Sequence, residues 1–350
     1  MISELELRRP DDWHLHLRDG EMLKAVLPYS SQQYGRAIIM PNLVPPLKRT
    51  KDIVAYRERI LAALPEGHQF SPLMTMYLAD DTDPDDLVAG FNGGIVEAVK
   101  FYPANATTNS AQGVSSIDKV SRILDAMQRA DIPLLIHCEV TEAEVDIFDR
   151  EARFIETILL PITVRHPELR IVIEHATTAE AVDFVMESGS NIGATITPQH
   201  VFLNRNALFK GGIRPHNYCL PILKREKHRA ALVKAITSSS GERFFLGTDS
   251  APHSRGKKES ACGCAGAFNT PIALALYASV FDAANALDKL EAFTSINGPN
   301  FYRKPVNEEI VTLIRKEQTV PEIINVPDMG EVVPFLAGEK INWMVKDSEK

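Results

Sequence analysis

Short unbroken runs of hydrophobic residues recur along the chain, and most are followed by a segment with helical spacing of its apolar positions. A compact apolar run indicates a strand that is buried on both faces, as in parallel sheets. The eight runs cover residues 13–18, 36–40, 73–78, 94–103, 133–139, 169–175, 191–197 and 244–250. The predicted helices cover residues 21–30, 51–64, 117–127, 141–160, 224–237 and 271–287, with others opening after the acidic loop 80–86 and at Thr177, where Glu180 completes a capping box.

Eight strand–helix repeats in roughly 250 residues are typical of a TIM barrel. We therefore predict an α/β fold in a single domain over residues 1–350, with a (β/α)8 barrel core at about 11–290. A C-terminal extension at about 297–350, with one helical stretch and several prolines, is expected to pack outside the barrel. The alternative is a doubly wound open sheet, but the glycine-rich phosphate turn that normally follows its first strand is absent from this sequence.

Composition excludes several classes of protein. The chain of 350 residues is 45% hydrophobic and 24% charged, and its net charge of −8 argues against nucleic acid as the main partner. Four cysteines are too few for a disulfide scaffold, and the pair in Cys262-Gly263-Cys264 has no second pair at a zinc-ribbon spacing. With no apolar run of membrane-spanning length and no signal-peptide pattern, we expect a cytoplasmic protein that does not bind membranes.

Polar residues interrupt the apolar runs near their C-terminal ends. His14 and His16 are two positions apart, so in a strand they share one face and can bind one metal ion. The other such residues are Lys100 in the fourth run, His137 in the fifth, His175 in the sixth and Asp249 in the eighth. Active sites of TIM barrels lie at this end of the strands, so we expect these side chains to converge there.

A metal centre explains this convergence, because burying such groups without a metal or partners costs several kcal/mol. Lys100 has two possible roles: an ion pair with Glu97 or Glu139, or addition of carbon dioxide to its neutral amine. The resulting carbamate can bridge two metal ions that hold a hydroxide between them. We predict two Zn²⁺ per chain, bridged by carboxylated Lys100. His14, His16 and Asp249 are assigned to one ion, and His137 and His175 to the other. Asp249 would take the proton of the attacking hydroxide and return it to the leaving nitrogen.

Several motifs resemble those of the amidohydrolase superfamily and, more closely, of its shorter, single-domain bacterial dihydroorotases. They are residues 14–20, 40–42, 100–103, 214–221, 247–253 and 262–266, and the resemblance runs from about Leu7 to the end of the chain. It implies a cyclic amide hydrolase that interconverts N-carbamoyl-L-aspartate and L-dihydroorotate in pyrimidine (UMP) biosynthesis. It also implies a homodimer.

The resemblance implies substrate contacts as well. Arg18, Asn42 and His253 would hold the dihydroorotate carboxylate, and Arg18 offers a two-pronged donor suited to it. Main-chain groups near Leu220 and Ala265 would contact the pyrimidine ring, and His137 would touch substrate as well as metal. Within the polar segment 104–116, Thr107 and Thr108 would reach the substrate as parts of a lid.

One position departs from the family pattern, because Asn105 stands where relatives often have glycine. Asparagine tolerates a left-handed backbone better than most residues, so we expect the turn to persist. Two other functions remain possible. One is a hydantoinase, which needs no carboxylate pocket, and the other is a scaffold protein that has lost catalysis, which would be expected to have lost some of the six metal-binding positions.

Overall fold

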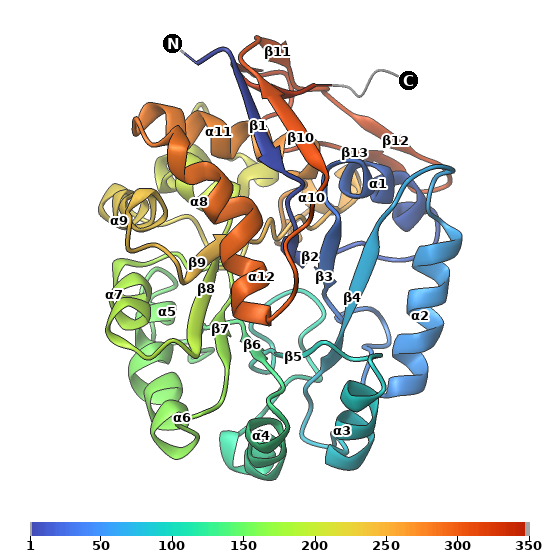
Figure 1. Ribbon diagram of the computed structural model, residues 1–350, viewed down its shortest axis with the longest axis vertical. Coiled ribbons are helices and arrows are strands. Elements are labelled where there is room, and N and C mark those ends of the chain that lie inside the picture. Colours follow the sequence, from blue (N-terminus) through green and yellow to red (C-terminus); the bar gives the residue numbers. More distant parts are fainter. Residues whose placement is uncertain (1, 347–350) are drawn as a thin grey trace.

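The computed structural model describes residues 2–346 and contains a barrel of eight parallel strands (Figure 1). The strands are β2 (Asp12–Leu15), β3 (Arg36–Ile39), β4 (Ser71–Tyr77), β5 (Ala98–Phe101), β6 (Leu134–Ile136), β7 (Ile171–Ile173), β8 (Ile192–Ile196) and β9 (Phe244–Leu246). Each pairs with the next along the chain. The circle closes where Leu15 bridges Ser250 in parallel and where the amide of Asp249 donates to the carbonyl of His14 at 2.8 Å. The predicted TIM barrel is confirmed.

Helices surround the strands on the outside of the barrel (Figure 1). They are α1 (Gly20–Gln33), α2 (Thr50–Ala62), α3 (Pro84–Asn92), α4 (Ile117–Ala130), α5 (Arg150–Phe154), α6 (Leu160–Arg165), α7 (Ala179–Glu187), α8 (Pro198–Phe202), α9 (Glu226–Thr237), α10 (Arg255–Lys258), α11 (Ala273–Ala283) and α12 (Asn297–Tyr302). Local sequence explains their starts: Asp19 caps α1 and Asp83 caps α3, each accepting a bond from a backbone amide of the first turn. No helix within residues 2–346 is long and apolar enough to cross a membrane.

Two local predictions were wrong. The helix predicted over 141–160 begins only after Asp149, since residues 141–149 form turns in which the Asp146 carboxylate accepts the amide of Phe148 at 2.8 Å. Such local bonds compete with helix formation. The helix predicted to open at Thr177 is capped by Thr178, whose hydroxyl accepts the amide of Ala181.

The C-terminal segment contains more strand than predicted. Besides α12, it forms β10 (Ile310–Ile314), β11 (Gln318–Thr319), β12 (Ile324–Val326), β13 (Gly330–Val332), β14 (Lys340–Ile341) and β15 (Met344–Val345). β10 lies between β15 and the N-terminal strand β1 (Glu4–Arg8), antiparallel to both, so the two ends of the chain share one small sheet (Figure 1). β12 and β13 form a hairpin, and Val332 bridges Ser254 in the loop after β9.

An aromatic cluster fills the barrel beneath the carboxyl ends of the strands. Trp13, one residue before His14, stacks on Tyr302 of α12 with ring centroids 4.3 Å apart, and Phe245 meets it edge-on. The close approach of α12 depends on Gly298, where an added Cβ would lie 1.9 Å from Nε1 of Trp13. Other members of the cluster are Ile38, Met40, Ala98, Leu135 and Val172. This packing forms the floor under the polar end of the barrel.

Candidate metal centre and active site

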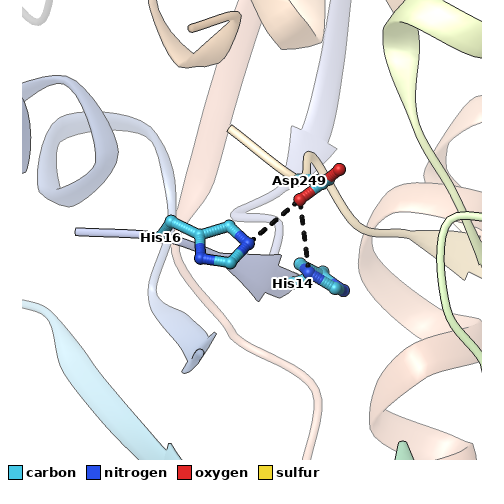
Figure 2. Close-up of side chains that lie close together, drawn as sticks. All are labelled: His14, His16 and Asp249. Atoms are coloured by element: carbon cyan, nitrogen blue, oxygen red, sulfur yellow. Dashed lines mark hydrogen bonds and ion pairs between the residues drawn. The ribbon is translucent and has the colours of Figure 1, made fainter. Parts of the chain in front are cut away.

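Three predicted ligands meet where the barrel closes. His14 lies in β2, His16 directly follows it, and Asp249 lies three residues beyond β9. Figure 2 shows both imidazoles pointing at one carboxylate oxygen: Oδ1 of Asp249 is 3.3 Å from Nε2 of His14 and 3.1 Å from Nε2 of His16. One donor atom from each of the three residues lies within 4.8 Å of the others, and all three are buried. This arrangement suits one metal ion.

A second pair of imidazoles lies beside the first group. Nδ1 of His137, the residue after β6, is 3.1 Å from Nε2 of His175, two residues after β7. The rings of His14 and His175 are only 5.1 Å apart between centroids, so the two groups form one continuous cluster. At His175 (φ 41°) and Asp249 (φ 45°) the backbone turns through the left-handed region as it leaves the strands. Strain of this kind concentrates at functional sites.

Two buried carboxylates, which were not predicted to bind the histidines, hold them in place. Glu174 accepts from Nδ1 of His14 at 2.6 Å, and Glu139 lies 2.8 Å from Nε2 of His137. Each contact occupies one ring nitrogen and leaves the other, Nε2 of His14 and Nδ1 of His137, facing the cluster. The signal was present in the sequence, because both glutamates lie within two residues of a predicted ligand at the end of an apolar run.

Lys100, inside β5, is fully buried, and its Nζ has no hydrogen-bond partner among the described residues. Both ion pairs considered for it are absent: Glu97 binds Lys304 at 2.9 Å, and Glu139 binds His137. Burial lowers the pKa of Lys100 to about 8, so the neutral amine is much more accessible at neutral pH than in an exposed lysine. A buried amine without a hydrogen-bond partner, beside two groups of candidate ligands, fits a lysine that becomes a carbamate between two metals.

Electrostatics keep most of the cluster in the protonation states that bind metals. Burial lowers the pKa of His16 to about 4, and burial together with the neighbouring imidazole of His137 holds the pKa of His175 well below its usual range. Burial alone would raise the pKa of Asp249, but His14 and His16 outweigh it and hold the pKa well below its usual range. Burial also opposes protonation of His14, yet Glu174 raises the pKa of this imidazole. His16 and His175 therefore offer neutral imidazoles, and Asp249 offers an ionised carboxylate.

A cationic pocket adjoins the cluster. Nη2 of Arg18 lies 3.1 Å from Nε2 of His253, and Nε of Arg18 donates to the carbonyl of Pro252 at 3.1 Å. Arg18 has a left-handed backbone (φ 59°), and the hydroxyl of Tyr56 donates to its carbonyl. Burial and the Arg18 charge lower the pKa of His253 to about 2, so the arginine carries the positive charge of this pair. Two of the residues predicted to bind a carboxylate are thus in contact.

The segment 104–116, which was predicted to form a lid, borders the cluster through Thr107 and Thr108. The side chain of Asn42 links this segment to His16: Oδ1 lies 2.9 Å from Nδ1 of His16, and Nδ2 donates to the carbonyl of Thr108 at 3.1 Å. The remaining cavity is only about 20 Å³, and its wall includes Thr107, Thr108, Leu220 and Ala265. A larger cleft of about 840 Å³ lies outside it and shares Arg18, Asn42 and Thr108. Asn105 adopts φ 66°, so the expected left-handed turn is present.

Comparison with known proteins agrees with this geometry. Residues 12–307 match the amidohydrolase family. A dihydroorotase of Cronobacter sakazakii is 58% identical over 342 residues, which cover 98% of both chains. Crystal structures of dihydroorotases from Campylobacter jejuni (35% identity) and from Saccharomyces cerevisiae in complex with 5-fluoroorotic acid (31% identity) each superpose with a TM-score of 0.90 over 99% of both chains. An L-hydantoinase of Arthrobacter aurescens, at 13% identity and a TM-score of 0.81, shares the fold. The chain therefore belongs to the amidohydrolase family, and the relatives that match it over nearly their whole length are dihydroorotases.

Proposed function

We propose that this enzyme is a zinc-dependent dihydroorotase, which interconverts N-carbamoyl-L-aspartate and L-dihydroorotate in pyrimidine biosynthesis. The observation that carries the proposal is that Arg18 lines the same small cavity as the four histidines and Asp249. Four histidines, Lys100 and Asp249 form the metal cluster, and Arg18 with His253 forms a cationic pocket beside it. Hydrolysis of a cyclic amide that bears a carboxylate needs a metal centre to activate water and a cationic pocket to bind the carboxylate.

The residues fit two Zn²⁺ ions. His14, His16 and Asp249 would hold one ion, His137 and His175 the other, and Lys100, as N6-carboxylysine, would supply an oxygen to each. When bound, such a pair polarises the substrate carbonyl and lowers the pKa of a water molecule so that it can attack at neutral pH. The ligating nitrogens are those left free by Glu174, Asn42 and Glu139.

Asp249 is the group placed to move a proton. Its ionised carboxylate lies at the centre of the cluster, so in hydrolysis it takes the proton released by the nucleophile. It then delivers that proton to the ring nitrogen as the amide bond breaks, and ring closure runs through the same steps in reverse. The low pKa of Asp249 keeps this carboxylate ionised at neutral pH, which is the form that can accept a proton.

Recognition of the substrate would come from three sides. Arg18, with Asn42 and His253, would bind the carboxylate of dihydroorotate through charge-assisted hydrogen bonds. Main-chain groups of Leu220 and Ala265, which line the small cavity, would contact the ring, and His137 would touch substrate as well as metal. Thr107 and Thr108 would donate to it from the lid and exclude water.

The test combines elemental analysis with an assay of dihydroorotate hydrolysis on one sample. We expect about two zinc ions per chain and turnover that is lost on chelation and restored by zinc. Asp249→Ala should lower kcat by at least about 100-fold, whereas Asp118→Asn, at a side chain that is 85% exposed on α4, should not change it. Turnover of hydantoin but not of dihydroorotate would refute the substrate, and full activity with one metal or none would refute the lysine bridge.

A homodimer and a cytoplasmic location belong to the same proposal, through the likeness to the dihydroorotases. Light scattering on the purified protein would measure the first. A mass of one chain at micromolar concentration would refute it.

A further inference from the structure

Lys258 ends the short helix α10 outside the metal cluster, and its side chain is buried. Its Nζ donates three hydrogen bonds of 2.8 Å each, to the backbone carbonyls of Tyr218, Cys264 and Gly266. An ammonium group has three protons, so all of its donors are used. All three acceptors are backbone carbonyls, so Lys258 links the segment at Tyr218 with the segment at 264–266.

The charge of Lys258 has no counter-ion among residues 2–346, since no carboxylate lies within ion-pairing distance. The neighbouring Glu259 is exposed and binds Arg255 at 2.9 Å and His216 at 3.0 Å. Burial lowers the pKa of Lys258 to about 8. A buried cation without a carboxylate is costly unless strong hydrogen bonds satisfy it, so the three carbonyls account for its presence here.

Two of those carbonyls belong to the neighbours of Ala265, the residue that faces the site. The carbonyls of Cys264 and Gly266 point to Lys258, whereas the carbonyl of Ala265 between them lies 3.0 Å from Nε2 of His253 and 3.4 Å from Oγ1 of Thr108. This alternation needs an unusual backbone, with φ 25° at Cys264 and 144° at Gly266. Cysteine does not favour that region, so the segment needs an external partner to hold it.

The same nitrogen reaches the second loop of the site. The carbonyl of Tyr218 accepts both Nζ of Lys258 and the amide of Gly266, the latter at 3.0 Å. Tyr218 lies two residues before Leu220, which lines the small cavity together with Ala265. Lys258 therefore fixes the spacing between the two main-chain segments that border this cavity.

We propose that Lys258 is a positioning residue for substrate binding, which aims the main-chain groups of Leu220 and Ala265 at the ring of a cyclic amide. The inference rests on the proposed function for the identity of that ring. Lys258 touches neither the metal ligands nor Asp249, so it acts on substrate affinity rather than on the chemical step. It adds to the positive potential at His253 as well, which favours an anionic substrate.

The test compares Lys258→Met with Lys257→Met, which removes an exposed lysine at the preceding position. For dihydroorotate hydrolysis, Lys258→Met should raise KM by about tenfold while kcat stays within about threefold of the original. Zinc content should be unchanged. Amide hydrogen exchange over residues 262–268 should become faster in Lys258→Met and stay unchanged in Lys257→Met.

Both the kinetic and the hydrogen-exchange measurements can overturn the proposal. A folded Lys258→Met enzyme with an unchanged KM, or with a loss confined to kcat, would overturn the proposal, as would unchanged exchange over 262–268. If the methionine variant does not fold, Lys258→Arg keeps a buried charge but cannot aim three donors from one nitrogen, and its KM should also rise. A KM equal to that of the original enzyme would then overturn the proposal. If the unmodified enzyme does not hydrolyse dihydroorotate, the proposed function fails. Hydrogen exchange then still tests whether Lys258 holds the backbone of residues 262–268.

Discussion

Replacing Gly298 by alanine should destabilise the barrel, although alanine is the better helix residue. Gly298 is the second residue of α12, and an added Cβ would lie 1.9 Å from Nε1 and 2.4 Å from Cε2 of Trp13. Trp13 is fully buried and stacked on Tyr302, so its ring has no free space to enter. To restore ordinary contact, the two elements must separate by about 1.5 Å.

The magnitude follows from two opposing effects. Overpacking a tight core costs about 1–3 kcal/mol. The cost at this site should be near the upper value, because the added Cβ would clash with the rigid indole ring of Trp13. The gain in helix propensity from glycine to alanine offsets about 1 kcal/mol. The net loss is therefore about 2 kcal/mol. With an unfolding entropy of about 2.1 cal/mol/K per residue, this loss lowers Tm by about 3 °C in a chain of 350 residues.

Calorimetry of the purified variant would measure this shift at fixed zinc concentration, because bound metal also raises Tm. Gly256→Ala is the matched control: Gly256 lies in α10, and no heavy atom is within 4 Å of its added Cβ. The control should leave Tm unchanged or raise it slightly. A Gly298→Ala protein with a Tm equal to or above the original would refute the packing argument.

Three further predictions concern the metal, the lid and acid stability. Lys100→Ala should bind fewer than the two zinc ions expected of the original chain, as measured by elemental analysis of protein dialysed with zinc; two tightly held ions would contradict the bridge. Asn105→Ala should lower kcat several-fold, because alanine tolerates φ 66° poorly by about 1 kcal/mol, whereas Asn105→Gly should not. Lys119 and Ser115 lower the pKa of Asp80 to about 2 even though burial alone would raise it. Since the folded value lies below the unfolded one, its stabilising effect should be complete above about pH 4 and lost towards pH 2. Urea unfolding of Asp80→Asn and of the original protein, both without metal, should therefore differ at pH 6 and converge in acid.

The barrel and its candidate ligands could be predicted because both depend on local sequence signals. Parallel strands buried on two faces are short apolar runs, and a histidine or lysine that interrupts such a run is visible without any knowledge of the fold. The runs overestimated strand length, however. The strand predicted at 169–175 ends at Ile173, because the backbone turns at His175 to aim its side chain inward.

Other features could not be predicted because they depend on contacts between distant residues. β1 pairs with β10, about 300 residues further on, and each strand is only five residues long. Lys258 resembles a surface lysine in sequence, and only the folded loops supply its three carbonyls. A helix was predicted over 141–160, yet the hydrogen bond from the Phe148 amide to the Asp146 carboxylate favours turns over its first part.

The closure of the barrel determines when this protein can acquire its metal. His16 and Asp249 are 233 residues apart in sequence but share one candidate ligand set. A nascent chain on the ribosome presents His14 and His16 early, yet it lacks Asp249 until nearly three-quarters of the sequence has been made. Closing so long a loop is entropically unfavourable before the intervening strands are in register. Metal capture at this position should therefore follow synthesis of these segments and occur only in molecules that have closed the barrel.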